Sequence, residues 1–561
     1  MRQWKRRLGV VIGAGAVAAV ALASSGVTAG APVEHAARFA WFDYRGSDGA
    51  PLPAGQYRNP ILAGFYSDPS IVRVGADFYL VTSTFSWFPG IPVFHSRDLV
   101  HWRQIGNAID RSGQLDFGTL AMSRGVFAPA ISYHAGRFYI VNTCVDCGGN
   151  YVITATNPAG PWSDPVWLKS VEGIDPSLFF DCDGSAWLVN NREPAGTPRY
   201  DGHRAIWIEK FDPVGLRMLG HPKMIVDGGV DPASKPVWIE GPHFYHVDDH
   251  YYLMAAEGGT SVNHSEVVLR ADTVEGAYVP APAAINPILT QRDLPAERPQ
   301  PISAAGHADL VQLRDGRWWS VFLATRPYAK DFYNTGRETF LLPVTWRDGW
   351  PVILAHETAI PRTGRAPLPS VQGAPPTTGS FTAHDDFGTS RLGPEWMTMR
   401  GATVRLAGGA LLLAPTRDGL GDFGRPAFVA RRQQHADAVV TTELRFTPAE
   451  GEMAGLAALQ NDEYFLTIAI TRKGGRDLVR VASRAGAKEP RDGVTIAEQP
   501  IRLAGAVRLR ITAHGGRYDF ALGDHGRWTS VARDVDGTNL STEKAGGFVG
   551  TMIGPFAQGP R

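Results

Sequence analysis

Pairs of short apolar runs separated by turn residues recur along the first two thirds of the chain. In the first pair, residues 71–74 lead through a turn at 75–77 into residues 78–81, which carry two neighbouring aromatic side chains. Two such runs around a turn are typical of a β-hairpin. Four further copies of this pattern lie at residues 128–141, 175–189, 240–254 and 307–321.

The spacing of the hairpins predicts the architecture of this part of the chain. The copies begin roughly 50 to 70 residues apart, and self-similarity at such a period is typical of propellers and solenoids. A repeat of this length suits one four-stranded propeller blade. We therefore expect residues 58–362 to form a five-bladed β-propeller.

A different series of short strands begins at Phe381. Turn residues separate alternating runs at residues 410–414, 438–446, 464–469 and 507–512. Regular short strands without helical periodicity predict a β-sandwich over residues 381–561. Residues 363–380 are rich in Pro, Gly, Ser and Thr and are expected to be a linker. Residues 32–57 are expected to lead into the propeller and pack across it. Because both predicted domains consist of strands, the predicted fold class is all-β.

The first 31 residues have the composition of an export signal. A basic run at 5–7 precedes an apolar stretch at 8–23, and small residues at 21–23 and 28–30 offer cleavage sites. We expect the protein to be exported to the periplasm or the cell exterior and to have no membrane attachment after cleavage. An uncleaved anchor is the alternative, although the apolar stretch is short for a membrane span.

Charge and cysteine content exclude some classes of function. Lys plus Arg and Asp plus Glu number 55 each, so the net charge is zero and nothing suggests a nucleic-acid partner. The three cysteines are Cys144, Cys147 and Cys182. No βαβ pattern surrounds the first two, and four ligands for a structural zinc are lacking. We interpret the cysteines as structural or incidental.

The hairpins place ionisable residues in register. Asp68, Asp175, Glu240 and His307 occupy the same position before or at the first strand of their repeats, where the second repeat has Ala128. Equivalent positions of a propeller form a ring around its axis. Turn formation is an alternative role, because Asp-Pro often initiates turns. It does not by itself explain the common register.

Three carboxylates on one axis suit the cleavage of a glycosidic bond. One group must be protonated to support the leaving oxygen, and another must be ionised to activate water or attack directly. A third carboxylate can raise the pKa of the acid. Aromatic side chains suit the apolar faces of sugars, and the candidates, for which blade core is the alternative, are Phe85, Trp87, Phe88 and Phe127.

Seven motifs in order carry a family resemblance. They lie at residues 67–70, 83–93, 173–177, 240–243, 256–260, 306–311 and 336–339. Together they resemble family 43 glycoside hydrolases of the β-xylosidase type. The resemblance continues into the C-terminal sandwich, which is similar to the concanavalin-like domain fused to these xylosidases.

The resemblance implies a role for each catalytic candidate. Asp68 becomes the general base, Glu240 the general acid, and Asp175 the residue that raises the pKa of the acid and positions it. The family inverts the anomeric centre, which implies a water between the base and the sugar. A loop of the second domain closes the pocket in such relatives, and residues 534–541 are our candidate for it here.

The resemblance also implies binding residues. Arg337 matches an arginine that binds the sugar, and Phe127 and Thr260 match pocket-lining positions. His307 matches an axial histidine that faces a water-coordinated cation in many relatives, which allows for a calcium ion in the channel. One histidine without an acidic cluster is a weak calcium signal. We expect no required cofactor.

The sequence favours one substrate reading and leaves others open. The favoured reading is an exo-acting β-xylosidase that releases xylose from xylo-oligosaccharides. An α-L-arabinofuranosidase, or an enzyme with both activities on arabinose-decorated xylan fragments, is the alternative, because few contacts separate the two sugars. A non-catalytic carbohydrate-binding propeller is disfavoured because all three carboxylates are present. A retaining fructosidase-type propeller is set aside because its Asn-Asp-Pro-Asn and Glu-Cys motifs are absent.

Overall fold

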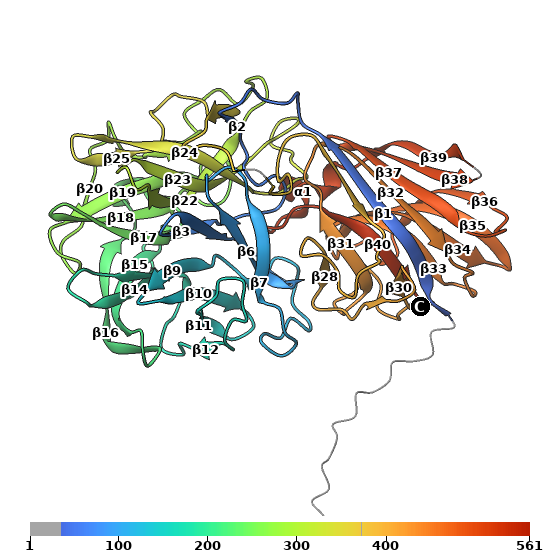
Figure 1. Cartoon of the computed structure of the whole chain (residues 1–561), viewed down its shortest axis with the longest axis horizontal. Helices are drawn as coiled ribbons and strands as arrows, with labels where there is room; N and C mark the ends of the chain where they lie inside the picture. Colours follow the sequence, from blue (N-terminus) through green and yellow to red (C-terminus); the bar gives the residue numbers. More distant parts are fainter. Residues whose placement is uncertain (1–34, 372, 525) are drawn as a thin grey trace, which may run out of the picture. The chain divides into compact units, whose positions relative to one another are not determined.

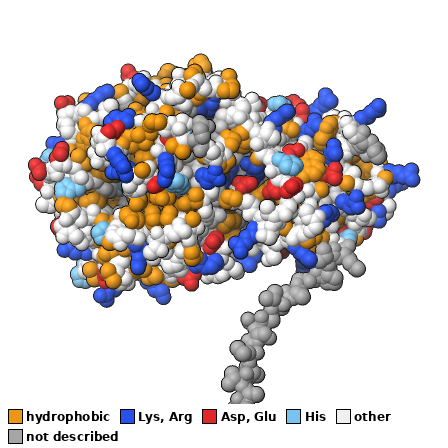
Figure 2. Space-filling view, viewed as in Figure 1, with side chains coloured by type: hydrophobic (Ala, Val, Ile, Leu, Met, Phe, Trp, Pro, Cys, Tyr) orange, Lys and Arg blue, Asp and Glu red, His pale blue; other side chains and the backbone are white. Residues whose placement is uncertain are grey.

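The computed structural model describes residues 35–371, 373–524 and 526–561 (Figure 1). The predicted export signal lies outside this range. The described residues form a β-propeller and a β-sandwich, which confirms the predicted all-β class. No helix in the described part of the chain is both long and apolar enough to span a membrane. Lys and Arg are interspersed with Asp and Glu on the face shown in Figure 2.

Each of the five predicted hairpins is the inner part of one propeller blade. Blade 1 is β3 (Ser70–Val74), β4 (Asp77–Val81), β6 (Gly90–Ser96) and β7 (Arg103–Ile109). Blade 2 is β9 (Ala130–His134), β10 (Arg137–Val145), β11 (Gly149–Ala155) and β12 (Val166–Trp167), with β8 (Gly125–Val126) also on β10. Blade 3 is β13 (Ile174–Phe180), β14 (Ala186–Arg192), β15 (Ala205–Asp212) and β16 (Arg217–Asp227).

The last two blades follow the same plan. Blade 4 is β17 (Glu240–Val247), β18 (His250–Glu257), β19 (Ser265–Ala271) and β20 (Val279–Pro280), with β21 (Leu289–Thr290) also on β19. Blade 5 is β22 (Ser303–Gln312), β23 (Trp318–Thr325), β24 (Glu338–Arg347) and β25 (Trp350–Val352). A short 3₁₀ helix, Pro232–Ser234, precedes blade 4.

The ring of blades closes between the first and the last. Inner strands contact one another in the order β3, β9, β13, β17 and β22, and β22 returns to β3. Asp309 of β22 accepts hydrogen bonds from the Ser70 hydroxyl at 2.8 Å and from the Ile71 amide at 2.9 Å. Its other oxygen accepts a bond from the Tyr245 hydroxyl at 2.6 Å. One buried carboxylate therefore ties blade 5 to blades 1 and 4.

The sandwich consists of two large sheets. The first runs β29 (Arg405–Leu406), β30 (Leu411–Leu413), β1 (Ala37–Ser47), β32 (Asp437–Arg445), β37 (Val507–His514), β38 (Arg517–Asp524) and β39 (Arg527–Asp536), with β27 (Phe381–Asp385) also on β1. The second runs β36 (Val494–Pro500), β35 (Arg476–Ala485), β34 (Tyr464–Lys473), β33 (Met453–Asn461), β40 (Met552–Gln558), β31 (Ala427–Arg432), β28 (Met397–Met399) and β5 (Trp87–Phe88). A 3₁₀ turn, Thr538–Leu540, and helix α1 (Thr542–Ala545) precede β40.

Two of the predicted boundaries are wrong. In the predicted entry segment the described residues, 35–57, do not pack across the propeller as a unit. Strand β1 instead pairs with β30, β32 and β27 and buries Phe39, Phe42 and Tyr44 in the sandwich core. The predicted linker, residues 363–380, also begins too early in the chain. Its first residues form β26 (Thr363–Arg365), which pairs with β2 (Gln56–Arg58) beside the propeller. A strand's partners depend on which core its apolar face completes, and local sequence does not reveal this.

Cys144 and Cys147 form a disulfide, and Cys182 is free and exposed. The bridge spans the turn between β10 and β11, so it is structural.

Candidate active site

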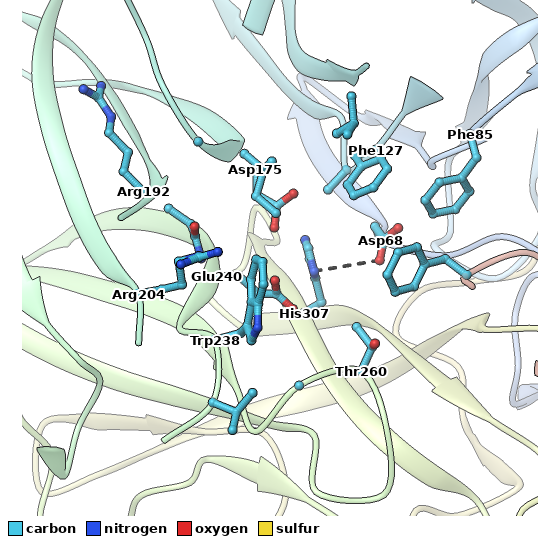
Figure 3. A pocket seen from close by; sticks show the side chains of 18 of the residues that line it. Asp68, Phe85, Phe127, Asp175, Arg192, Arg204, Trp238, Glu240, Thr260 and His307 are labelled. Atoms are coloured by element: carbon cyan, nitrogen blue, oxygen red, sulfur yellow. Dashed lines mark ion pairs between the residues drawn. The ribbon is translucent and has the colours of Figure 1, made fainter. Parts of the chain in front are cut away.

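A cavity of about 680 Å³ opens on the propeller axis (Figure 3). The three predicted catalytic residues, Asp68, Asp175 and Glu240, all line it. Five of the six predicted binding residues also line it, namely Phe85, Phe127, Thr260, His307 and Arg337. The sixth, Trp87, does not.

The axial residues share a backbone geometry. Asp68, Asp175 and His307 have φ values of 55°, 52° and 53°, a left-handed conformation that is uncommon outside glycine. In blades 3, 4 and 5 the register of the inner hairpin shifts at this same point. Such a bulge re-aims side chains, and strained backbone is often kept at functional sites. The repeats therefore turn their first polar side chain towards the axis.

Asp68 is held as an anion. Two Arg337 nitrogens lie 3.0 and 3.2 Å from its two oxygens, and the Ser83 hydroxyl donates a hydrogen bond of 2.6 Å. His307 lies 3.8 Å away. Burial alone raises the pKa of Asp68, but Arg337, His307 and Ser83 outweigh it and bring the pKa below its usual value. Asp68 is therefore ionised at neutral pH.

Glu240 and Asp175 have the opposite electrostatics. Burial, and then the negative charge of Asp68, raise the pKa of Glu240 to about 7, against weaker opposing effects of Arg337 and Arg204. Burial, followed by the charges of Glu240 and Asp68, raises the pKa of Asp175 well above its usual value. The pair therefore retains a proton near neutral pH, so the pocket combines an ionised base with a protonated acid.

His307 is a neutral, closely packed axial residue. Burial lowers its pKa to about 4. A β-carbon on Gly241 would lie 2.7 Å from its imidazole Nε2. Gly241 also has a φ of +58°, so glycine is needed next to Glu240 both for space and for backbone conformation.

The channel below the pocket gives little support for direct calcium binding. The cavity lined by Asp68, Asp175, His243 and His307 has a volume of about 10 Å³, which is the least that a single water needs. Among the described residues, no group of three ligand side chains gathers there. These residues do not offer the oxygen-rich shell that calcium prefers. The calcium expectation stays a prediction, and no chemical step here depends on it.

Aromatic rings form the wall beside Asp68. The Phe85 ring stacks on Phe548 with centroids 5.7 Å apart and meets the edge of Phe127 at 5.2 Å. The Arg337 guanidinium lies 5.4 Å from the Phe548 centroid. Phe548 belongs to the sandwich, and its amide donates a hydrogen bond of 2.9 Å to the Ser123 hydroxyl of the propeller. The sandwich therefore contributes directly to this pocket wall.

The pocket-closing segment lies later in the chain than residues 534–541. That predicted loop contains the end of β39 and the 3₁₀ turn before α1, and none of its residues lines the cavity. Phe548 follows α1 in a Gly-Gly-Phe sequence and is not among the residues predicted to line the pocket. An aromatic residue next to two glycines was the available signal.

Trp87 is a buried interface residue, so its predicted binding role is wrong. It is fully buried, pairs in β5 with Met399 of β28, and meets the edge of Phe428 at 6.0 Å. Phe85 and Trp87 are two residues apart, a spacing that would place them on one face of a regular strand. Phe85 instead has a φ of 51°, and the Trp87 amide bonds back to Thr84 in a turn. The two rings therefore point in different directions.

Sequence reasoning missed the side of the pocket beyond Glu240. Arg204 lies 4.2 Å from the centroid of the Trp238 ring and pairs with Glu193 at 2.5 Å. Arg192 and Glu193 also line the cavity, and Arg192 lies on the same side of Glu240 as Arg204 in Figure 3. All four lie outside the hairpin position used to align the repeats. Only Trp238, two residues before Glu240, offered a local signal.

Fold and site together define a class. The pocket holds an ionised carboxylate and a protonated carboxylic acid beside an aromatic wall. Glycoside hydrolases use this combination of groups. The family model described as Glycosyl hydrolases family 43 matches residues 57–351. The model of the Beta xylosidase C-terminal Concanavalin A-like domain matches residues 384–561. The chain therefore belongs to glycosyl hydrolase family 43.

Relatives match nearly the whole chain. A Xylosidase/arabinosidase of Butyrivibrio fibrisolvens is 36% identical over 516 residues, covering 89% of this chain and 95% of the relative. A non-reducing end alpha-L-arabinofuranosidase of Bacteroides ovatus is 37% identical and covers 90% and 91%. The solved structure of a GH43_12 protein from a capybara gut metagenome has a TM-score of 0.87 at 37% identity, covering 93% of this chain and 99% of that one.

Proposed function

We propose that this protein is an exo-acting β-xylosidase that inverts configuration and releases xylose from the non-reducing ends of xylo-oligosaccharides. The observation that carries the proposal is the opposite electrostatic treatment of two carboxylic side chains in one pocket. Asp68 is kept ionised, whereas the pKa of Glu240 is raised to about 7. General acid and general base catalysis needs this division.

In the proposed reaction, a water molecule is added across the glycosidic bond. Glu240 donates its proton to the glycosidic oxygen as the bond to the anomeric carbon breaks. Asp68 accepts a proton from a water whose oxygen bonds to the anomeric carbon from the opposite face. Asp175 shares the retained proton with Glu240, because two neighbouring buried carboxyl groups resist ionising together, and it positions the acid. Return of the proton from Asp68 to Glu240 through solvent restores the starting state.

The shape of the pocket supports exo action. Phe548 and Phe85 stack beside Asp68, and the Arg337 guanidinium packs against both rings. A wall on this side suits a terminal sugar better than the middle of a chain. The leaving chain would then extend past Glu240 towards Trp238 and Arg204.

A second candidate is α-L-arabinofuranosidase activity, alone or together with xylosidase activity. The names of the two relatives above support it, since one is a Xylosidase/arabinosidase and the other an alpha-L-arabinofuranosidase. The two sugars present similar hydroxyl groups, so a few contacts decide between them.

Two nitrophenyl glycosides test the proposal directly. Hydrolysis of the β-D-xylopyranoside and the α-L-arabinofuranoside is compared for the wild type and Glu240→Ala. Faster, Glu240-dependent cleavage of the xyloside supports the first candidate, and faster cleavage of the arabinofuranoside supports the second. Inactivity on both and on xylobiose would favour a carbohydrate-binding propeller. Proton NMR of the first-formed anomer tests inversion, and a retained anomer would overturn that part.

We also propose that the protein is exported. The composition of residues 1–31 supports this, as does the Cys144–Cys147 disulfide, because such bonds persist in oxidising compartments. Cell fractionation of the full-length protein should find it outside the cytoplasm. A variant in which Lys5, Arg6 and Arg7 are all changed to neutral residues should stay inside. A cytoplasmic wild type would refute the proposal.

A further inference from the structure

A second group of reactive side chains lies away from the active site, between the hairpin turns of blades 3 and 4. Asp181 and Cys182 follow directly after β13, and His246 lies near the end of β17. Their ligand atoms all lie within 4.8 Å of one another. The strand from Asp175 to Asp181 spans roughly 20 Å, so the group is far from the catalytic carboxylates.

The distances match those of a metal site. The Cys182 sulfur lies 3.8 Å from His246 Nδ1, which lies 3.3 Å from Asp181 Oδ1. Zinc bonds of about 2.0 to 2.3 Å at tetrahedral angles place neighbouring ligand atoms roughly 3.3 to 3.6 Å apart. Two of the three separations are therefore close to those that one shared zinc ion would require, and the third is within 4.8 Å.

Neighbouring groups orient the ligands. The Tyr251 hydroxyl donates a hydrogen bond of 2.7 Å to Asp181 Oδ2. Asp181 Oδ1 accepts a bond of 2.7 Å from the Cys182 amide and also faces His246. The Tyr251 ring stacks on the His246 imidazole, with centroids 4.2 Å apart and planes at 12°. One tyrosine thus fixes both a carboxylate and an imidazole, the kind of outer support that metal sites use.

The carboxylate of Asp181 also lacks a permanent cation. Its side chain is only 2% exposed. Among the described residues, its one ion-pair partner is His246, which is charged only when protonated, and no Lys or Arg lies within ion-pair distance. Buried charges are usually paired or coordinate metals. A bound cation would supply the missing charge.

We propose that Asp181, Cys182 and His246 bind a zinc ion that clips blade 3 to blade 4. Thiolate, imidazole and carboxylate together suit zinc better than calcium or magnesium. Cys182 and His246 are accessible, so the fourth position is open to water. Binding releases the thiol proton of Cys182 to solvent. The ion would link the two blades, and no catalytic residue takes part.

Cobalt substitution tests the site, because Cys182 is the free thiol and the other two cysteines are bridged. The full-length protein is titrated with Co²⁺ and followed by thiolate-to-cobalt charge-transfer absorption. We expect one Co²⁺ per chain, displaced by Zn²⁺. Cys182→Ser should lose the band, and His246→Ala should bind at least about tenfold more weakly. Absence of the band in the wild type, or unchanged affinity in His246→Ala, would overturn the proposal.

A control and a second readout separate binding from misfolding. His250→Ala removes a neighbouring histidine that pairs with Asp272 instead, and it should bind Co²⁺ like the wild type. Zinc at about 100 times its Kd should favour the folded state about 100-fold in the wild type and leave the unfolding of Cys182→Ser unchanged. Glycosidase activity should persist in Cys182→Ser. Equal stabilisation of both proteins by zinc would show that it binds elsewhere.

Discussion

The two sides of the active-site pocket treat the same functional group in opposite ways. On the side of blades 1 and 5, Asp68 has a bidentate arginine and a serine hydroxyl, and its pKa is lowered despite full burial. On the side of blades 3 and 4, Asp175 and Glu240 lie together without such a partner, and their pKa values rise. These environments suit Asp68 to the proposed role of base and Glu240 to the proposed role of acid.

The same comparison explains why Arg337 matters more than its single positive charge suggests. It neutralises Asp68, and its guanidinium carbon lies 5.9 Å from the centroid of the Phe85 ring and 5.4 Å from that of the Phe548 ring. One side chain thus connects the base to the aromatic wall. The other side of the pocket has Arg204 over Trp238, but Arg204 forms its ion pair with Glu193.

Removing either carboxylate of the base and acid pair should have the largest effect. Asp68→Ala and Glu240→Ala should each lower kcat by at least about 100-fold, the low end for general acid–base catalysis. A substrate with a very good leaving group should partly restore Glu240→Ala, because such a group needs no proton. It should not restore Asp68→Ala. Equal restoration of both variants in steady-state assays would contradict the assigned roles.

Removing the arginine should make the Asp68 side resemble the other side. In Arg337→Ala the pKa of Asp68 should rise, because burial is no longer offset. Activity requires ionised Asp68, so the acidic limb of the kcat/KM profile should move to higher pH, with a loss of about tenfold or more at neutral pH. The control is Arg124→Ala, which removes a pocket arginine that pairs with Asp146. An unmoved acidic limb would disprove the role of Arg337.

Neutralising Asp175 tests the acidic side. Glu240 must be protonated, so the wild type should lose activity as pH rises through about 7. In Asp175→Asn no second carboxyl group resists the ionisation of the pair, so the pKa of Glu240 should fall and the basic limb should move to lower pH. The pH dependence of kcat/KM measures this. An unchanged basic limb would show that Asp175 does not raise the pKa of Glu240 and only positions it.

The smallest effect is expected at the aromatic wall. Phe548→Leu should raise KM several-fold and change kcat little, because the ring contacts the sugar rather than the reacting atoms. Trp87→Leu makes the same kind of change in the buried interface, where it should lower thermal stability and leave KM unchanged. A KM effect from Trp87→Leu alone would reverse our assignment of the two rings.

The sequence was most informative where repeats impose geometry. Hairpin periodicity predicted the blades, and the common register of Asp68, Asp175, Glu240 and His307 predicted their convergence. It failed where a side chain's direction depends on one backbone angle, as at Trp87. It also failed at β1, which is adjacent in sequence to the propeller but completes the sandwich.

What the sequence alone determined is the inventory: five hairpin repeats, a second all-β region, three axial carboxylates and the aromatic residues near them. Tertiary structure decided how that inventory acts. Phe548 reaches the pocket from the second domain, Arg337 reaches Asp68 across the closure of the ring, and His246 reaches Cys182 from the next blade. Protonation states and ligand sets depend on distances of a few ångströms between residues far apart in sequence, because electrostatic effects act through space rather than along the chain.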